Sequence, residues 1–138
     1  TVTNPYCIAK NDNMVSINAI MEIDLTGQVC SESIGTRQYS GPGGAFDFAY
    51  GAAHSKGGRS ILIMHSTTNK GESKIKPILT PGAVVTIPRP YVDIVVTEYG
   101  IAHMRGQTVQ SRVKNLIAIA HPDVREELTY EAKKLFYI

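Results

Sequence analysis

Apolar and polar residues alternate along the first part of the chain. Met14–Asp24 reads MVSINAIMEID, with apolar residues at every second position from 15 to 23. This is the period of a strand that buries one face. The glycine-containing stretch Leu25–Gln28 predicts a turn, after which Val29–Ile34 can return as a second strand. The pattern therefore predicts a β-hairpin.

Apolar runs and glycines organise the middle of the chain. Small and aromatic residues in Ala45–Ser55 predict a tightly packed helix, which Lys56–Gly58 (KGG) would end. Arg59–His65 (RSILIMH) is a continuous apolar run, typical of a strand that is covered on both faces. The polar, glycine-bearing stretch Ser66–Ser73 is predicted to be a loop.

The last part of the chain changes from strand to helix periodicity. Two apolar runs, Ala83–Ile87 and Val92–Thr97, flank a Pro-Arg-Pro bend that prevents strand pairing. Thr108–Ala120 then repeats its apolar residues with the period of a helix. Asp123–Leu135 follows a proline and carries acidic residues early and lysines late, as a helix dipole favours. Buried strands alternating with helices predict an α/β domain, a layered open sheet with flanking helices.

Composition and charge narrow the class of protein. The chain has 138 residues, 43% of them apolar and 19% charged, which is enough for one domain with a core. Its net charge of +2 gives no electrostatic case for nucleic acid. No apolar run is long enough to span a membrane. Cys7 and Cys30 are expected to be buried thiols in a reducing cytoplasm, and no metal site is expected.

The start of the chain resembles the interior of a domain. It opens on Thr1 rather than methionine and has no apolar leader. We therefore expect the chain to be a piece of a larger protein.

The segment Ser40–Gly44 (SGPGG) stands immediately before the helix predicted from Ala45. If the segment opens that helix, the N–H groups of Gly43 and Gly44 have no intrahelical partner and suit a phosphate or an oxyanion. A tight turn would use the same glycines, and Asp47 could itself accept the free N–H groups. The residues alone leave both interpretations open.

Charged residues near the predicted strand ends are further candidates. Glu98 and His65 each follow an apolar run, and ligands of open α/β sheets bind at strand ends. From the residues alone, a structural role for Glu98 is favoured, in which it pairs with a neighbouring arginine or caps a turn. No serine or cysteine has a nucleophile-elbow pattern, so packing or surface roles are expected for most of the four histidines. Lys70, Lys74 and Lys76 could steer an anion or form a solvated face.

Four segments, in this order and spacing, carry a resemblance that extends from about Asn4 to Leu128. They read IGTRQYSGPGGAFDFAYGAAHSKGGRSI, GESKIKPIL, VVTEYGIAHMRG and LIAIAHPDVREEL. Together they closely resemble the C-terminal domain of the acetyl-CoA hydrolase/transferase family, and most nearly its 4-hydroxybutyrate or butyrate–acetate CoA-transferase branch. The resemblance implies a NagB/RpiA-like α/β fold, with residues 1–138 forming one domain of a longer two-domain enzyme whose active site lies between the domains.

The resemblance also implies a chemistry. The family moves CoA between carboxylates by a ping-pong route, in which a glutamate attacks the acyl-CoA and an enzyme–CoA thioester follows an acyl anhydride. Gly43 and Gly44 would donate backbone N–H groups to the thioester carbonyl. The residues expected to bind CoA or substrate are Tyr39, Ser40, Gly41, Asp47, His65, Lys70 and Glu98. The motif around the nucleophilic glutamate is not present, and Glu98 is not expected to be that nucleophile.

Two positions depart from the family pattern, since Ala45 and Tyr50 stand where a polar residue and an arginine are expected. By resemblance the substrates are acyl-CoA and small carboxylates, with no permanently bound cofactor. The expected enzyme is cytoplasmic and homo-oligomeric, needs the missing N-terminal domain, and binds neither nucleic acid nor a membrane. An acetyl-CoA hydrolase is one alternative. A non-catalytic domain that binds CoA or a partner through an exposed apolar interface is the other.

Overall fold

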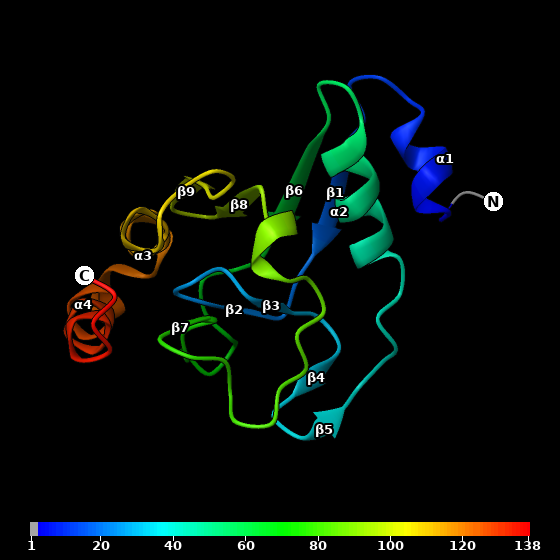
Figure 1. Cartoon of the computed structure of the whole chain (residues 1–138). Coiled ribbons are helices and arrows are strands. Elements are labelled where there is room, and N and C mark those ends of the chain that lie inside the picture. The colour runs from blue at the N-terminus through cyan, green and yellow to red at the C-terminus, as the bar shows by residue number, and fades with distance from the viewer. Residues whose placement is uncertain (1–2) are drawn as a thin grey trace.

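Three parallel strands form the centre of the fold in the computed structural model, which describes residues 3–138 (Figure 1). β1 (Val15–Ala19), β6 (Arg59–Ile63) and β8 (Ile94–Thr97) run parallel, and β9 (Gly100–His103) pairs antiparallel with β8. The order across this sheet is β1-β6-β8-β9. The predicted α/β class, with open sheets and flanking helices, is confirmed.

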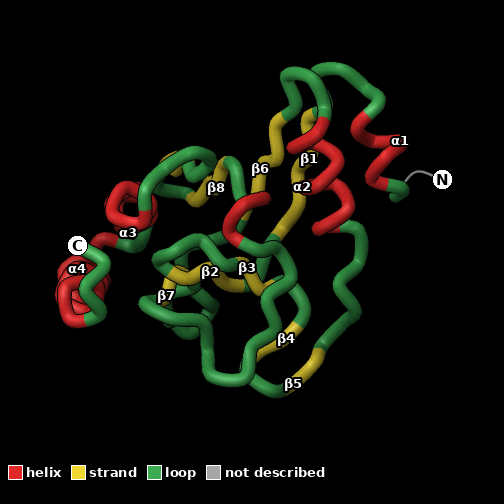
Figure 2. Tube along the Cα trace, viewed as in Figure 1, coloured by secondary structure: helices red, strands yellow, loops and turns green. Residues whose placement is uncertain are grey.

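Two smaller sheets follow β1 in the chain. β2 (Glu22–Asp24) lies between β3 (Val29–Cys30), which is antiparallel to it, and β7 (Ile75–Lys76), which is parallel. β4 (Ser33–Ile34) and β5 (Arg37–Gln38) form a two-stranded hairpin. Figure 2 shows these short strands, with loops making up much of the chain around them.

Helices cover one face of the four-stranded sheet. α2 (Ala45–His54) contacts β1 and β6, and α3 (Val109–Ile119) contacts β9. The short α1 (Pro5–Ala9) packs on α2, while the single turn η2 (Pro122–Val124) leads into α4 (Arg125–Lys134), which contacts α3. A further turn, η1 (Arg89–Tyr91), contacts α2.

The apolar core lies between these helices and the sheets. Its largest fully buried side chains are Ile23, Leu25, Leu62, Ile75, Ile87, Met104 and Leu116. Cys30 is also buried and Cys7 is exposed, so the expectation of a buried thiol holds for Cys30 alone. Within residues 3–138, no helix combines the length and apolar character needed to cross a membrane.

The prediction of a single strand over residues 14–24 is wrong. Ile20 donates its N–H to Ile63 of the large sheet, whereas Met21 donates to Cys30 of the smaller one, so the chain changes sheets between them. The expected burial of β1 is also reversed, since Ser16 is buried while Val15 and Ile17 are exposed. Helix α2 lies on the Ser16 face, which local periodicity could not reveal.

Other predicted strands are only partly confirmed. β6 forms within the Arg59–His65 run, but its Ile63 side chain is exposed, so the strand is not covered on both faces by the described residues. The hairpin of β2 and β3 forms, with strands shorter than predicted. Residues 83–87 are not a strand and contribute one bridge, from Ile87 to Val29. The sequence did not predict β9.

The predicted helices are confirmed with small changes at their ends. α2 ends at His54, and Gly57 follows with a positive φ of 72°. Thr108 caps α3 by accepting a hydrogen bond from the Ser111 N–H at 3.2 Å. The second predicted C-terminal helix begins as the turn η2 at Pro122 before continuing as α4.

Candidate functional site

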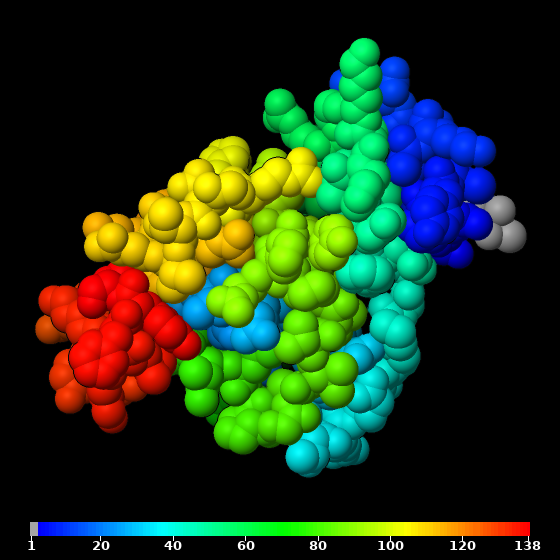
Figure 3. Space-filling model, in the orientation of Figure 1, coloured from blue at the N-terminus to red at the C-terminus, as the bar shows by residue number. Residues whose placement is uncertain are grey.

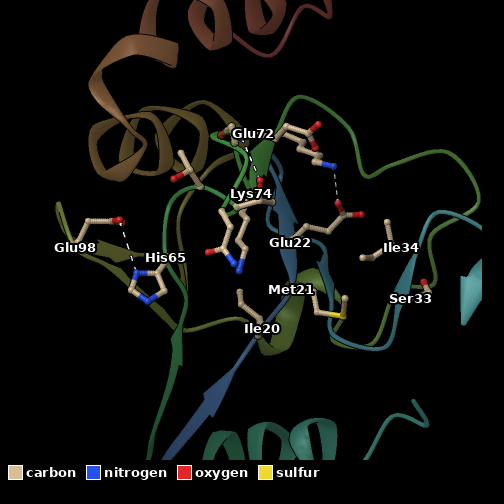
Figure 4. Close-up of a pocket in the computed structure, with 14 residues that line it drawn as sticks. Ile20, Met21, Glu22, Ser33, Ile34, His65, Glu72, Lys74 and Glu98 are labelled. Atoms are coloured by element: carbon tan, nitrogen blue, oxygen red, sulfur yellow. Dashed lines mark hydrogen bonds and ion pairs between the residues drawn. The ribbon is translucent and has the colours of Figure 1, made fainter. Parts of the chain in front are cut away.

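A pocket of about 580 Å³ lies at the carboxyl ends of the three parallel strands (Figure 4). Ile20 and Met21 follow β1, His65 follows β6 and Glu98 follows β8, and all four line the pocket. Ligands of open α/β sheets bind at this edge because the loops that leave parallel strands converge there. The topology therefore makes this pocket the main candidate site.

Loop 66–73 and the hairpin β4–β5 supply the outer walls of the pocket. Lys74 donates its backbone N–H to the Ser66 carbonyl at 2.8 Å, which ties the two ends of the loop together. Within the loop, Thr68 donates to the Glu72 carbonyl at 2.8 Å. The side chains that the loop places along the pocket include Thr67, Thr68, Asn69 and Glu72. Ser33 and Ile34 line the opposite wall (Figure 4).

Glu98 and His65 face each other at one end of the pocket (Figure 4). The Glu98 carboxylate accepts a hydrogen bond from the Ser66 N–H at 2.7 Å, and its other oxygen lies 3.9 Å from His65 Nδ1. Partial desolvation raises the pKa of Glu98, but the Ser66 hydrogen bond and His65 outweigh it, so the pKa is lowered overall. Glu98 is therefore an anion at neutral pH.

This lowered pKa predicts a pH-dependent contribution of Glu98 to stability. The native contacts favour the charged carboxylate, so its stabilisation is present above the ordinary pKa near 4.5 and is lost as pH falls through the lowered value. In Glu98→Gln, the amide oxygen can still accept the Ser66 hydrogen bond. We expect wild type to be slightly more stable than Glu98→Gln at pH 7, with the difference shrinking as pH falls below 4.5 through the lowered pKa of Glu98.

Urea denaturation of both proteins at several pH values measures this difference. It should be small, because 41% of the Glu98 side chain is exposed and solvent screens its charge. A stability difference that stays constant from pH 7 to pH 3 would contradict the assignment of a charge effect.

A buried ion pair forms another wall of the pocket. Lys76 Nζ lies 2.9 Å from the Glu22 carboxylate, which also accepts hydrogen bonds from the Thr80 N–H at 3.1 Å and the Thr80 hydroxyl at 2.9 Å. The Glu22 side chain is 7% exposed and that of Lys76 is 30% exposed. Each charge of the pair is therefore satisfied within the protein, and Lys76 is not free to bind an anion.

Lys74 is the pocket cation that remains available. Its ammonium group has no ion-pair partner among residues 3–138, although it shares the pocket with the carboxylates of Glu72 and Glu98. A carboxylate or phosphate that entered the pocket could bind Lys74 without breaking an existing ion pair.

The glycine segment lies outside this pocket, at the start of α2. Gly43 has a φ of +59°, and a Cβ built on it would have no heavy atom within 4 Å, so the backbone is open to a ligand. Gly44 is the N-cap of α2, and no side chain in the described residues caps that helix. Asp47 forms no such hydrogen bond, so the first-turn N–H groups remain available.

The hairpin β4–β5 holds the glycine segment in place. The Glu32 carbonyl accepts hydrogen bonds from the N–H groups of Tyr39 and Ser40, at 2.9 and 3.2 Å. The Tyr39 ring is exposed and lies 5.0 Å from the Arg37 guanidinium. In Figure 3 the connection from β5 to α2 runs along the molecular surface. The segment is thus anchored at its start and accessible along its length.

The structure divides the residues predicted from sequence into two groups. His65 and Glu98 line the pocket. A second group belongs to the glycine segment or the first turn of α2 and does not line it: Tyr39, Ser40, Gly41, Gly43, Gly44 and Asp47. Lys70 is exposed at the tip of loop 66–73 and does not line the pocket either. Glu22 was missed, because a charged residue at a polar position of an alternating strand gives no signal.

Similar proteins are found over almost the whole chain. Residues 1–132 match the family model of the acetyl-CoA hydrolase/transferase C-terminal domain. The chain is 57% identical over 136 residues to the 4-hydroxybutyrate coenzyme A transferase of Clostridium kluyveri, covering 98% of this chain and 32% of that protein. It is 53% identical over 135 residues to the succinyl-CoA:cyclohexane-1-carboxylate CoA transferase of Geobacter metallireducens, covering 97% and 31%.

A solved structure and a more distant relative complete the comparison. The 4-hydroxybutyrate CoA-transferase of Porphyromonas gingivalis matches with a TM-score of 0.78 and 46% identity, over 96% of this chain and 30% of that one. An acetyl-CoA hydrolase of Candida albicans is 31% identical over 144 residues, covering 99% of this chain and 26% of that protein. The chain spans about a third of the length of these curated CoA transferases.

Proposed function

Because this chain belongs to the acetyl-CoA hydrolase/transferase C-terminal domain family, we propose that it supplies part of the active site of a CoA-transferase. The enzyme would move CoA from an acyl-CoA to an acceptor carboxylate. The observation that carries this proposal is the similarity to proteins named CoA transferases at 53–57% identity, well above the 31% identity to a hydrolase.

The reaction would proceed in two half-reactions. A glutamate carboxylate attacks the thioester carbonyl of the acyl-CoA, and CoA leaves as a thiolate. This gives an acyl–glutamyl anhydride. The thiolate then attacks the glutamyl carbonyl, which releases the first carboxylic acid as its carboxylate and leaves a glutamyl–CoA thioester. An acceptor carboxylate reverses these steps and leaves as the new acyl-CoA, which restores the glutamate.

We place the attacking glutamate outside this chain. Three glutamates line the pocket, and two of them are already engaged: Glu22 binds Lys76 and Thr80, and Glu98 accepts from Ser66. Such contacts lower the nucleophilicity of a carboxylate by stabilising its charge. Their arrangement supports roles in shaping the pocket rather than in attack. The third, Glu72, does not stand in the motif expected around the attacking glutamate of the family.

The glycine segment would stabilise the oxyanion of each attack. The N–H groups of Gly43 and Gly44 stand at an uncapped helix start, where the helix dipole favours negative charge. Tyr39, Ser40 and Gly41 would line the same wall against CoA. In the pocket, Lys74 would attract the anionic ends of the substrates. His65, Lys70 and Asp47 stay candidates for contacts with CoA or the acid.

An activity assay tests the proposal on the intact protein that contains this chain. We expect an acyl-CoA to be consumed only when a second carboxylate is present, with a new acyl-CoA formed in equal amount. Release of free CoA without an acceptor would identify a hydrolase instead. The 138-residue chain alone should show no turnover, because the attacking glutamate is absent, and turnover by the purified chain would contradict that assignment. The proposal also includes a cytoplasmic, homo-oligomeric enzyme with no permanently bound cofactor.

A further inference from the structure

One face of the four-stranded sheet is mostly apolar and mostly uncovered among residues 3–138, although Ile94 on it is only 9% exposed and the side chains of Arg59 and His103 share it. Four large apolar side chains on it are strongly exposed: Val15 at 51%, Ile17 at 62%, Ile63 at 41% and Ile101 at 60%. Strand pairing places them side by side, because residues opposite each other across a ladder point to the same face. One row across the sheet is Ala19, Ile63, Val96 and Ile101, and the next is Ile17, Ile61, Ile94 and His103. We call these two rows, with Val15, the open face.

The open face is not a surface that α2 or α3 could cover. Both helices pack on the other face, where Leu62, Val95 and Ala102 are fully or almost fully buried. Thr97, also on that face, donates its hydroxyl to the Ile119 carbonyl of α3 at 2.6 Å. Parallel strands of α/β proteins are normally covered on both faces by helices. Within residues 3–138, this sheet therefore has one of its two covering layers.

The edge of the sheet beside β1 is also open. Met14 and Ile20 bond to β6 through their backbones, so the alternating residues Val15, Ile17 and Ala19 direct their N–H and C=O groups away from β6. β1 is the end strand of the sheet as described, yet it carries exposed apolar residues and no charged side chain. Natural edge strands are usually protected by charges, prolines or bulges. β1 has the character of an internal strand.

We propose that the open face is an interior surface of the longer enzyme, covered by an apolar segment of the same polypeptide that lies outside this chain. This inference rests on the proposed function, since it assumes the longer enzyme. The relatives are about three times as long as this chain, so their sequence contains enough residues for a covering layer. The apolar rows fit such a segment, because the sheet needs helices on this face to bury its parallel strands.

Thiol labelling of the intact enzyme tests the coverage. Ile17→Cys and Ile101→Cys place a thiol on the open face at two distant strands, while Tyr130→Cys places one on the exposed surface of α4. Peptide mass spectrometry reads the labelling rate at each position after a maleimide pulse. We expect both open-face thiols to react at least about 10-fold more slowly than the α4 thiol, because a buried thiol reacts only after local opening.

A photo-cross-linking residue at position 17 identifies what covers the face. The expected product is a single polypeptide in which position 17 is joined to a peptide outside residues 1–138. A product of twice the mass, together with protection that disappears on dilution, would identify a second copy and overturn the proposal. Labelling of both open-face thiols as fast as the α4 thiol would overturn it as well.

The activity of the same samples separates this inference from the proposed function. An active CoA-transferase whose open-face thiols label rapidly would disprove the covered face and leave the function standing. Slow labelling and an intramolecular cross-link in an enzyme without CoA-transferase activity would support the covered face and disprove the function.

Discussion

Replacing Lys76 with methionine is expected to lower the free energy of unfolding by about 2 kcal/mol. The substitution leaves the Glu22 carboxylate buried without its cation, 7% exposed and held by Thr80 alone. Removing one partner of a buried ion pair typically costs about 3–5 kcal/mol. The lower figure applies here because Lys76 is 30% exposed and the Thr80 hydrogen bonds remain. Urea denaturation at pH 7 measures the change.

Two control variants show whether the loss comes from the unpaired charge. Lys70→Met removes an exposed lysine from loop 66–73 and should change stability by less than about 0.5 kcal/mol. Adding Glu22→Gln to Lys76→Met removes the buried charge as well, and should recover part of the loss. The stability loss of Glu22→Gln alone is the reference. If the double variant is less stable than Lys76→Met by that same amount, the two residues are not coupled and the explanation is wrong.

Local patterns in the sequence were sufficient where neighbouring residues decide the structure. The helices α2 and α3 and the strand β6 follow from the composition and periodicity of their own segments. The prediction of one strand over residues 14–24 failed. The chain changes sheets at Met21 because of a hydrogen bond to Cys30, which the periodicity of the segment cannot encode. β9 was missed because only its pairing with β8 identifies the four residues Gly100–His103 as a strand.

The candidate site was also predictable only in part, where single strands decide the position of a residue. His65 and Glu98 could be placed at strand ends from sequence, and parallel pairing of β6 and β8 brings them to one pocket edge. Glu22 could not be found, because its partner Lys76 lies on β7, far along the chain. The glycine segment was recognised by composition, but only the fold shows that it stands apart from the pocket. A ligand that used both would have to extend across the carboxyl edge of the sheet.

Replacing Gly43 with alanine is expected to lower kcat/KM for CoA transfer by about 100-fold or more in the intact enzyme, the scale of losing an oxyanion-hole donor. The open space around Gly43 means that a new methyl group would meet no protein atom within 4 Å. It would instead stand where a ligand must approach the backbone N–H groups. The loss should appear in kcat/KM measured with a saturating acceptor carboxylate.

Gly106→Ala is the matched control for this substitution. Gly106 also has a positive φ, at 75°, and a Cβ there would also meet no atom within 4 Å, but it lies in the turn before α3. Each variant forces alanine into the left-handed region, so both should lose about 1 kcal/mol of stability. If the loss of activity comes from strain, both variants will lose activity equally. If the loss comes from a blocked oxyanion site, only Gly43→Ala will lose activity, since both glycines have a positive φ and differ in position.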